Sequence, residues 1–143
     1  VEWVQKRKAE WGPVVRTPHM GECMRIAALE QPTFDSEFLI DFCHKNRVAL
    51  VLKMPQTRCC NGESVYCNTF GGAVLSRGGS GDLLAGLIGG NLAQQTKGRE
   101  FDAVMRAVVW HGKAAEALAR KRGQIAVRTT DVLAYLSEVL RSN

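Results

Sequence analysis

No two cysteines in this sequence are spaced as a CxxC pair, although the chain contains five cysteines. A structural zinc site needs such pairs, or a cysteine pair followed by a histidine pair, and the sequence offers neither pattern. The odd number of cysteines also argues against a closed set of disulfides. We therefore predict reduced thiols, a cytoplasmic protein and no metal site built from its own side chains, because disulfides are rare in reducing compartments.

A run of apolar residues long enough to cross a membrane is also missing. The longest apolar stretch, Leu83–Ala93, is interrupted by three glycines and an asparagine, and a bilayer requires about 20 residues. Val1 does not open a leader with basic, apolar and small-residue parts. We expect a buried helix at Leu83–Ala93, and neither a membrane anchor nor a secretory signal.

Basic segments interleaved with aromatic side chains, which bind nucleic acids, are absent as well. The net charge is +5, from 19 Lys and Arg against 14 Asp and Glu, and the basic residues cluster briefly at Lys6–Lys8 and Arg120–Arg122. These features argue against a nucleic-acid partner. A small anionic ligand fits the charge balance better.

What remains is the composition of an ordinary globular protein, with 45% hydrophobic and 23% charged residues. The sequence contains no internal repeat, low-complexity tract or linker, so we expect residues 1–143 to form one domain or part of one. The patterns predict helices at Glu2–Trp11, Gly21–Leu29, Asp35–Asn46, Asp82–Gln95, Phe101–Lys121 and Thr130–Leu140, and strands at Pro13–Thr17, Val48–Leu52, Thr57–Cys60 and Ser64–Cys67.

Two local signals refine these elements. Asn61-Gly62 predicts a hairpin between the last two strands, and Thr129 or Thr130 is the expected cap of the last helix. Val48–Leu52 is apolar on both faces, which is typical of a parallel strand covered by helices. The pattern predicts a mixed α/β fold in which helices flank a largely parallel sheet.

Polar residues follow the first two predicted strands and open a later helix. They are Thr17–Glu22, Lys53 and the loop Gly78–Asp82. Ligands of open α/β sheets bind outside the carboxyl ends of the strands, so we expect all three clusters at one edge. Taken alone, Lys53 is either a phosphate partner or a solvated strand end. His19 lies among turn residues, whereas His111 is expected to pack inside a helical core.

The loop Gly78–Asp82 predicts an anion site. It runs directly into a helix, whose free N–H groups and positive dipole end would point at one spot. Glycine lets the backbone approach a phosphate closely and adopt positive φ. The sequence lacks the GxxxxGKS of Walker loops and the GxGxxG of dinucleotide folds, so the loop belongs to neither class.

Asp82 has two interpretations, which the residues alone leave open. A carboxylate beside an anion site repels the ligand, and this placement is useful if the aspartate takes the proton of an attacking hydroxyl during phosphoryl transfer. Alternatively, Asp82 caps the helix by accepting hydrogen bonds from N–H groups two or three residues further on.

Several motifs together resemble the carboxyl-terminal part of the ATP- or ADP-dependent NAD(P)H-hydrate dehydratases of the ribokinase-like superfamily. The matching segments, in the family's order, are "VVRTPHMGE", "LVLKMPQT", "YCNTFGGAVLSRGGSGDLLAGLIGGNLAQ" and "VVWHGKAAEALA". The resemblance implies a three-layer ribokinase-like (Rossmann-like) α/β fold, of which this chain is the later half. We also expect a homo-oligomer.

The resemblance further implies a repair reaction on hydrated NADH or NADPH. ATP or ADP, accompanied by Mg²⁺, phosphorylates the hydroxyl of the hydrated ring, and loss of phosphate restores the dihydronicotinamide. Carried over by motif, Asp82 is the catalytic base and contacts the substrate together with His19. Lys53 and Thr57 bind the nucleotide phosphates, and the N–H groups of Gly79, Ser80 and Gly81 form the anion hole.

The chain departs from the family in three respects. Met20 stands in place of a proline, Met54 replaces a glycine and would crowd a nucleotide, and the family's earlier half is missing. The chain is then either a fragment or a protein whose open surface another chain covers. Two alternative functions follow: a small-molecule kinase of the same superfamily, acting on a sugar or vitamin precursor, and a non-catalytic nucleotide-binding or assembly module.

Overall fold

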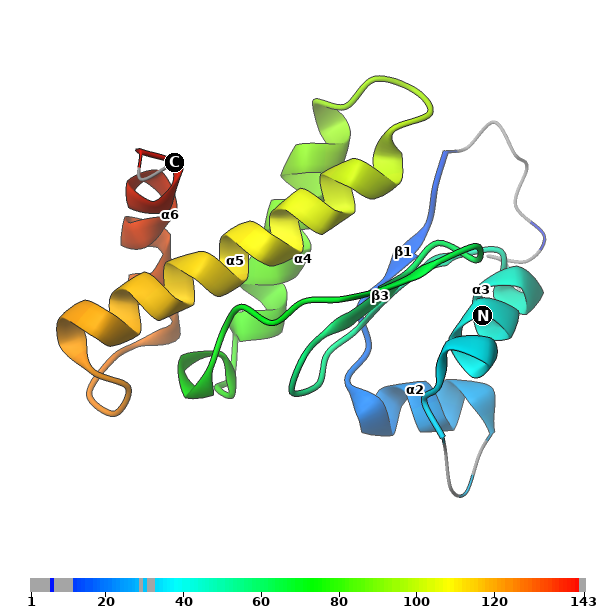
Figure 1. Ribbon diagram of the computed structural model, residues 1–143, viewed down its shortest axis with the longest axis horizontal. Helices are drawn as coiled ribbons and strands as arrows, with labels where there is room; N and C mark the ends of the chain where they lie inside the picture. The colour runs from blue at the N-terminus through cyan, green and yellow to red at the C-terminus, as the bar shows by residue number, and fades with distance from the viewer. Residues whose placement is uncertain (1–5, 7–11, 29, 31–32, 142–143) are drawn as a thin grey trace. The chain divides into compact units, whose positions relative to one another are not determined.

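The computed structural model describes residues 6, 12–28, 30 and 33–141, which fall into two compact units, residues 1–68 and 69–143 (Figure 1). The predicted helix at Glu2–Trp11 lies outside the described residues, apart from Lys6. The prediction that residues 1–143 act as one domain, or as part of one, stays a prediction.

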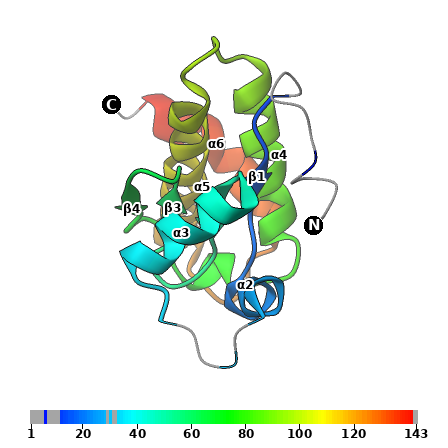
Figure 2. The same cartoon turned by 90° about the vertical axis from the view of Figure 1, so that its right-hand side faces the viewer.

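The first unit is a four-stranded sheet with two described helices. The strands lie in the order β1 (Val15–Arg16), β2 (Ala49–Leu52), β3 (Arg58–Cys60) and β4 (Val65–Cys67). Helices α2 (Met20–Ala27) and α3 (Ser36–Asn46) connect β1 to β2, and α3 packs on β2, β3 and β4 (Figure 2). The strands and helices predicted in the described part of this unit are confirmed, with ends that differ by a few residues.

The sheet is less parallel than the sequence predicts. β1 and β2 pair in parallel, but β2 pairs antiparallel with β3, and β3 pairs antiparallel with β4. A parallel connection needs about a dozen or more residues, and the segments Lys53–Thr57 and Asn61–Ser64 are too short for one. The prediction of a largely parallel sheet is therefore wrong for the described strands.

The predicted hairpin between β3 and β4 is confirmed. Asn61 Oδ1 accepts hydrogen bonds from the N–H groups of Glu63 and Ser64, both at 2.9 Å, and Gly62 has a φ of 94°. An asparagine that bonds the backbone two residues on, followed by a glycine with positive φ, closes the turn.

The core of the first unit lies between the sheet and its helices. Alternate residues of β2, Leu50 and Leu52, are fully buried and pack with Leu39 and Phe42 of α3 and Cys23 of α2. Full burial of an apolar side chain of this size contributes about 1.5–3 kcal/mol. The pattern of β2 thus fixes which of its residues meet α3.

All five cysteines are free thiols, as predicted. Four of them are buried, and burial is the main reason why the pKa of Cys59 is raised to about 12. The reactive form of cysteine is the thiolate. Cys59 is therefore a packing residue rather than a redox group.

The second unit is helical. Its elements are the 3₁₀ turn η2 (Ala73–Leu75), helix α4 (Ser80–Ala93), helix α5 (Glu100–Arg122), the 3₁₀ turn η3 (Thr129–Asp131) and helix α6 (Val132–Arg141). The long helix α5 packs along both α4 and α6 (Figure 1). The buried core of this unit includes Val74, Leu118 and Val132. The three predicted helices are confirmed.

The start of α6 differs from the prediction. A 3₁₀ turn precedes the helix, and there the Asp131 carboxylate accepts the N–H of Arg128 at 2.9 Å. The hydroxyl of Thr129 donates instead to the carbonyl of Gly78 at 2.8 Å. The predicted cap at Thr129 or Thr130 is therefore wrong, because Asp131 bonds the backbone there and Thr129 is used elsewhere.

Helix α5 makes an unusually close contact with the segment before η2. A Cβ at Gly112 would lie 2.7 Å from the carbonyl oxygen of Phe70, a distance that real Cβ atoms do not show. One turn further on, Glu116 Oε1 accepts the N–H of Gly71 at 3.1 Å. The absence of a side chain at Gly112 thus lets the backbone of Phe70 lie on the helix.

Replacing Gly112 by alanine is expected to destabilise the protein, because the new methyl group meets fixed backbone. We expect a loss of roughly 1–3 kcal/mol in the free energy of unfolding, the usual cost of overpacking. The matched control is Gly89→Ala in α4, where a Cβ meets nothing within 4 Å; this change gains up to about 1 kcal/mol from helix propensity. Urea unfolding measures both. Equal stabilities of the two variants would contradict the close contact.

Candidate functional site

The predicted site residues fall into both units. His19, Lys53 and Thr57 belong to the first unit, and Gly79, Ser80, Gly81 and Asp82 belong to the second.

In the first unit, parallel pairing brings the ends of β1 and β2 together. The N–H of Lys53 donates to the carbonyl of Pro18 at 2.8 Å, and His19 and Lys53 form an isolated parallel bridge. Both residues follow their strands directly, which is where ligands of open α/β sheets bind. Thr17–Glu22 and Lys53 thus lie together as predicted, whereas the position of the loop Gly78–Asp82 at the same edge stays a prediction, because that loop belongs to the other unit.

His19 is the N-cap of α2. Its Nδ1 accepts the N–H of Glu22 at 3.2 Å, while Glu22 Oε2 accepts the N–H of His19 at 2.8 Å. This reciprocal pair is a capping box. Because Nδ1 accepts, the neutral imidazole carries its proton on Nε2, and the side chain is 56% exposed. This Nε2 lies 3.6 Å from Glu22 Oε1, so the N–H donor of His19 is exposed beside a carboxylate.

Glu22 is surrounded by positive charge. The hydrogen bond from the His19 backbone is the main reason why the pKa of its carboxyl lies below the usual value; slight burial opposes this shift, and His19, Lys53 and Arg25 add to it. Sequence analysis missed this role, although Glu22 follows His19 by three residues, the spacing of a capping box. The ends of β1 and β2 thus hold one ionised carboxylate among several cations.

A cavity of about 550 Å³ opens beside these residues, at the carboxyl end of β1. Ligand pockets range from about 300 to 1,000 Å³, so this volume suits a small molecule. Arg16 and Arg25 line it together with Glu22, and the side chain of neither arginine forms a hydrogen bond or ion pair with a described residue. This cavity can accept an anionic group.

Lys53 and Thr57 flank the turn between β2 and β3. Both side chains are half-buried, and the Thr57 hydroxyl donates weakly to the Met54 carbonyl at 3.4 Å. The side chain of Met54 packs against the core cluster of the unit. The expectation that Met54 crowds a ligand is therefore not supported, because its side chain is used in the core.

In the second unit, the glycine loop runs into α4 through a left-handed turn. Gly79 is the N-cap with a φ of 85°, and no side chain caps the helix. The N–H of Ser80 donates to the carbonyl of Arg77 at 3.2 Å. Within the described residues, the N–H groups of Gly79, Gly81 and Asp82 have no backbone or side-chain acceptor. They are the donors that this loop offers to an anion.

Asp82 is the third residue of α4, and its side chain is exposed. Its carboxylate forms no hydrogen bond or ion pair with any described residue. The alternative that Asp82 caps the helix is therefore wrong, because the helix begins two residues earlier, at Ser80. A free carboxylate beside free N–H groups can act as a base next to a bound anion.

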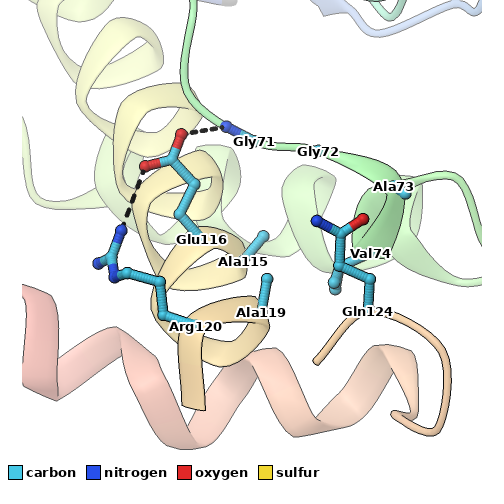
Figure 3. A pocket seen from close by; sticks show the side chains of 9 residues that line it. All are labelled: Gly71, Gly72, Ala73, Val74, Ala115, Glu116, Ala119, Arg120 and Gln124. Atoms are coloured by element: carbon cyan, nitrogen blue, oxygen red, sulfur yellow. Dashed lines mark hydrogen bonds and ion pairs between the residues drawn. The ribbon is translucent and has the colours of Figure 1, made fainter. Parts of the chain in front are cut away.

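A second, smaller cavity belongs to the second unit, where the segment Gly71–Val74 and residues of α5 line it. Figure 3 shows Glu116 between Gly71 and Arg120, with Oε1 at 3.1 Å from the Gly71 nitrogen and Oε2 at 3.8 Å from an Arg120 nitrogen. The volume of this cavity is about 180 Å³, below the usual range of ligand pockets. It does not hold a whole nucleotide. No sequence signal marks Glu116, because charged residues are common on helices.

His111 is buried in α5, as predicted, with 4% of its surface exposed. Its Nε2 has no hydrogen-bond partner among the described residues. Burial lowers the pKa of His111 to about 4. The imidazole is therefore neutral at pH 7 and packs in the core.

The described part of the chain holds neither a cluster of metal ligands nor a membrane-spanning helix. No group of three or more His, Cys, Asp and Glu in the described part of the chain is arranged to hold a metal ion. No described helix combines the length and the apolar character that a membrane span requires.

The chain is similar to proteins of one family. The family model described as NAD(P)H-hydrate dehydratase matches residues 2–138. A bifunctional NAD(P)H-hydrate repair enzyme of Moorella thermoacetica is 35% identical over 136 residues, covering 92% of this chain and 25% of that protein. An ADP-dependent (S)-NAD(P)H-hydrate dehydratase of Listeria monocytogenes is 36% identical over 106 residues, covering 74% and 37%.

A solved structure agrees with these relatives. The ADP/ATP-dependent NAD(P)H-hydrate dehydratase of Bacillus subtilis, co-crystallised with ATP and Mg²⁺, matches with a TM-score of 0.82 at 28% identity, over 92% of this chain and 49% of that one. A ribokinase-like superfamily protein of Enterococcus faecalis matches over 90% of the chain with a TM-score of 0.78. The ribokinase-like α/β fold is confirmed, and the chain spans about half of these structures.

Replacing Gly79 by alanine is expected to strain the glycine loop. The left-handed φ of 85° costs an L-residue about 1–2 kcal/mol, so the free energy of unfolding should fall by about that amount. Gly78→Ala is the matched control, because Gly78 has no positive φ and a Cβ there meets nothing within 4 Å. Thermal and urea unfolding measure the difference. Equal losses in the two variants would argue against a left-handed turn at Gly79.

His111 is expected to make stability depend on pH. Its pKa is about 4 in the folded protein and about 6.5 in an unfolded chain, so the unfolded state binds the proton more readily. Stability is therefore lost as pH falls through 6.5 toward 4, by roughly 2 kcal/mol between pH 7 and pH 5. His111→Gln should remove this part of the dependence, whereas His44→Gln, at an exposed position, should not. The midpoints of urea unfolding at pH 7 and pH 5 measure this dependence. If it is unchanged in His111→Gln, His111 is not its cause.

Proposed function

This chain belongs to the NAD(P)H-hydrate dehydratase family, and we propose that its protein repairs hydrated NADH and NADPH by a nucleotide-dependent dehydration. The chain spans 25% of the Moorella relative and 49% of the Bacillus structure, so we propose the activity for the full native protein. One observation carries the proposal: the unpaired carboxylate of Asp82 follows a loop with unpaired N–H groups.

The chemistry we propose is phosphoryl transfer followed by elimination. The hydroxyl oxygen of the hydrated ring attacks the terminal phosphoryl group of ATP or ADP, and Asp82 takes the hydroxyl proton as the new O–P bond forms. The nucleotide leaves with one phosphate fewer. The carbon–oxygen bond of the phosphate ester then breaks, phosphate departs and the ring loses a proton, which restores the double bond.

The N–H groups of the glycine loop are the proposed anion hole. Those of Gly79 and Gly81 are free, and they lie at the N-terminus of α4, where the helix dipole favours negative charge. The N–H of Ser80 donates to Arg77 in this structure, so Ser80 acts in the hole only if that weak turn bond opens. Fixed donors of this kind stabilise the charge that develops in the transition state.

Residues of the first unit are proposed to bind the two substrates. The ammonium group of Lys53 and the hydroxyl of Thr57 bind nucleotide phosphates, and the Nε2–H of His19 contacts the hydrated cofactor. The cavity lined by Arg16 and Arg25 supports an anionic substrate in this region, since a dinucleotide carries phosphate groups.

Mg²⁺ is the metal we propose for the nucleotide. It takes one or two carboxylates together with phosphate oxygens, and the described residues hold no cluster of three potential ligands. The nucleotide phosphates would supply oxygen ligands to this ion. When bound, Mg²⁺ neutralises negative charge on those phosphates.

We also propose a cytoplasmic homo-oligomer. The free thiols support a reducing compartment. Exposed apolar side chains at Leu133 and Leu140, seven residues apart on α6, support a covered face in an assembly. Light scattering on the purified protein gives the oligomeric state directly.

Replacing Asp82 by asparagine is expected to lower kcat by about 10²–10⁴-fold, the usual contribution of a positioned base. The assay follows the return of NADH absorbance from hydrated NADH with Mg²⁺ and either ATP or ADP. The matched control is Asp102→Asn, because Asp102 is also the third residue of its helix, where it pairs with Arg99 at 2.9 Å. Its kcat should stay near that of the wild type.

Three other results would change the proposal. No recovery of absorbance from the full native protein rejects the dehydratase. Accumulation of a phosphorylated product from another hydroxyl compound favours the small-molecule kinase, and nucleotide binding without turnover favours the non-catalytic module. An active Asp82→Asn variant keeps the reaction but removes Asp82 as its base.

A further inference from the structure

Arg77, directly before the glycine loop, bonds three backbone carbonyls of one distant segment. Its Nη1 donates to the carbonyl of Val127 at 2.8 Å, and its Nη2 donates to the carbonyls of Ile125, at 3.0 Å, and Gln124. These acceptors lie between α5 and η3. The guanidinium thus ties the connection after α5 to the second residue of the SRGGSGD segment, which directly precedes the glycines.

Thr129 adds a second tie from the same connection. Its hydroxyl donates to the carbonyl of Gly78 at 2.8 Å, and its methyl carbon lies 3.9 Å from where a Cβ of Gly79 would be. Arg77 and Thr129, with the carbonyls that they bond, form what we call the carbonyl clamp. The clamp thus holds the chain by hydrogen bonds at Arg77 and Gly78, the two residues before the left-handed turn at Gly79.

Burial of apolar side chains contributes little to holding the connection between α5 and η3 in place. Residues 121–126 are exposed, Ile125 by 90%, and Val127 is the buried residue of the connection. No described carboxylate pairs with Arg77, and its buried Nε has no acceptor among the described residues. Desolvating a guanidinium without a counter-ion is costly, so the position of this side chain is set by the three carbonyls that it bonds.

We propose that Arg77 and Thr129 are positioning residues for the anion hole: the carbonyl clamp holds Gly78–Gly81 in the conformation that aims free N–H groups at a transferring phosphate. This inference rests on the proposed function. Glycine-rich backbone loses much conformational freedom on ordering, and donors stabilise a transition state only when they are held in place beforehand. The clamp supplies the restraint that the glycines lack.

The test uses four variants of the clamp in the full native protein. Arg77→Met removes all three hydrogen bonds, and Arg77→Lys keeps the positive charge without the planar guanidinium. Thr129→Val removes the hydroxyl group, and Thr129→Ser retains it. Arg141→Met, at an exposed arginine of α6 without a partner among the described residues, is the control. Each variant is measured for kcat, for the KM of the nucleotide and for thermal stability.

We expect both Arg77 variants to lower kcat by about ten- to a hundredfold, with a smaller change in KM, because the hole acts mainly on the transition state. Thr129→Val should lower kcat several-fold, and Thr129→Ser should recover most of it. Arg141→Met should match the wild type. A clamp that serves stability alone would lower the melting temperature and leave the kcat of the folded enzyme unchanged, and that result would overturn the proposal.

Amide hydrogen exchange separates this inference from the proposed function. The N–H groups of Ser80 and Leu83 donate to the carbonyls of Arg77 and Gly79 at 3.2 and 3.1 Å, so they report on the loop without any turnover. We expect at least tenfold faster exchange at both amides in Arg77→Met and Thr129→Val. Unchanged exchange overturns the clamp, even if the wild type is active; an inactive wild type with accelerated exchange rejects the reaction and keeps the clamp.

Discussion

The left-handed turn at Gly79 is the constraint on which the candidate chemistry depends. With a φ of 85° it starts α4 at Ser80 rather than at Asp82. A residue with a side chain would resist this angle, and a helix that began later would use the Asp82 carboxylate as its cap. Because the turn comes where it does, the first N–H groups of the helix and the carboxylate are left unpaired together. One backbone angle thus produces both the anion donors and the base.

In the first unit, strand pairing brings the candidate binding residues together. The parallel alignment of β1 and β2 continues past the strands, where the N–H of Lys53 bonds the carbonyl of Pro18 and His19 begins α2. Nδ1 of His19 accepts a hydrogen bond in the helix cap, and Nε2 lies 3.6 Å from Glu22 Oε1 on an exposed side chain. The hydrogen bond from the His19 backbone, and after it the charges of His19, Lys53 and Arg25, lower the pKa of the Glu22 carboxyl. The local fold therefore favours an anionic ligand before any ligand is considered.

Sequence patterns were sufficient for what depends on neighbouring residues. Helices, strands, the Asn61-Gly62 hairpin and the glycine loop follow from periodicity and turn chemistry, and the position of Lys53 follows from the end of an apolar strand. The antiparallel half of the sheet was missed because the apolar pattern of β2 resembles that of a parallel strand. Arg77 was missed because its partners lie 47 to 50 residues away, and side chains that bond distant carbonyls leave no local pattern.

The free carboxylate of Asp82 is the strongest physical argument for catalysis. Two unit charges 4 Å apart interact by about 1 kcal/mol in water and by about 4 kcal/mol at an effective dielectric constant of 20, so Asp82 weakens anion binding at the very loop that attracts anions. It also adds little to stability, because no described group bonds it and its interaction with the helix dipole is worth only about 0.3–1 kcal/mol. A residue that opposes binding and adds little to the fold is useful if it changes charge during the reaction. Once Asp82 takes a proton the repulsion disappears, so the transition state is held more tightly than the ground state, which is the condition for catalysis.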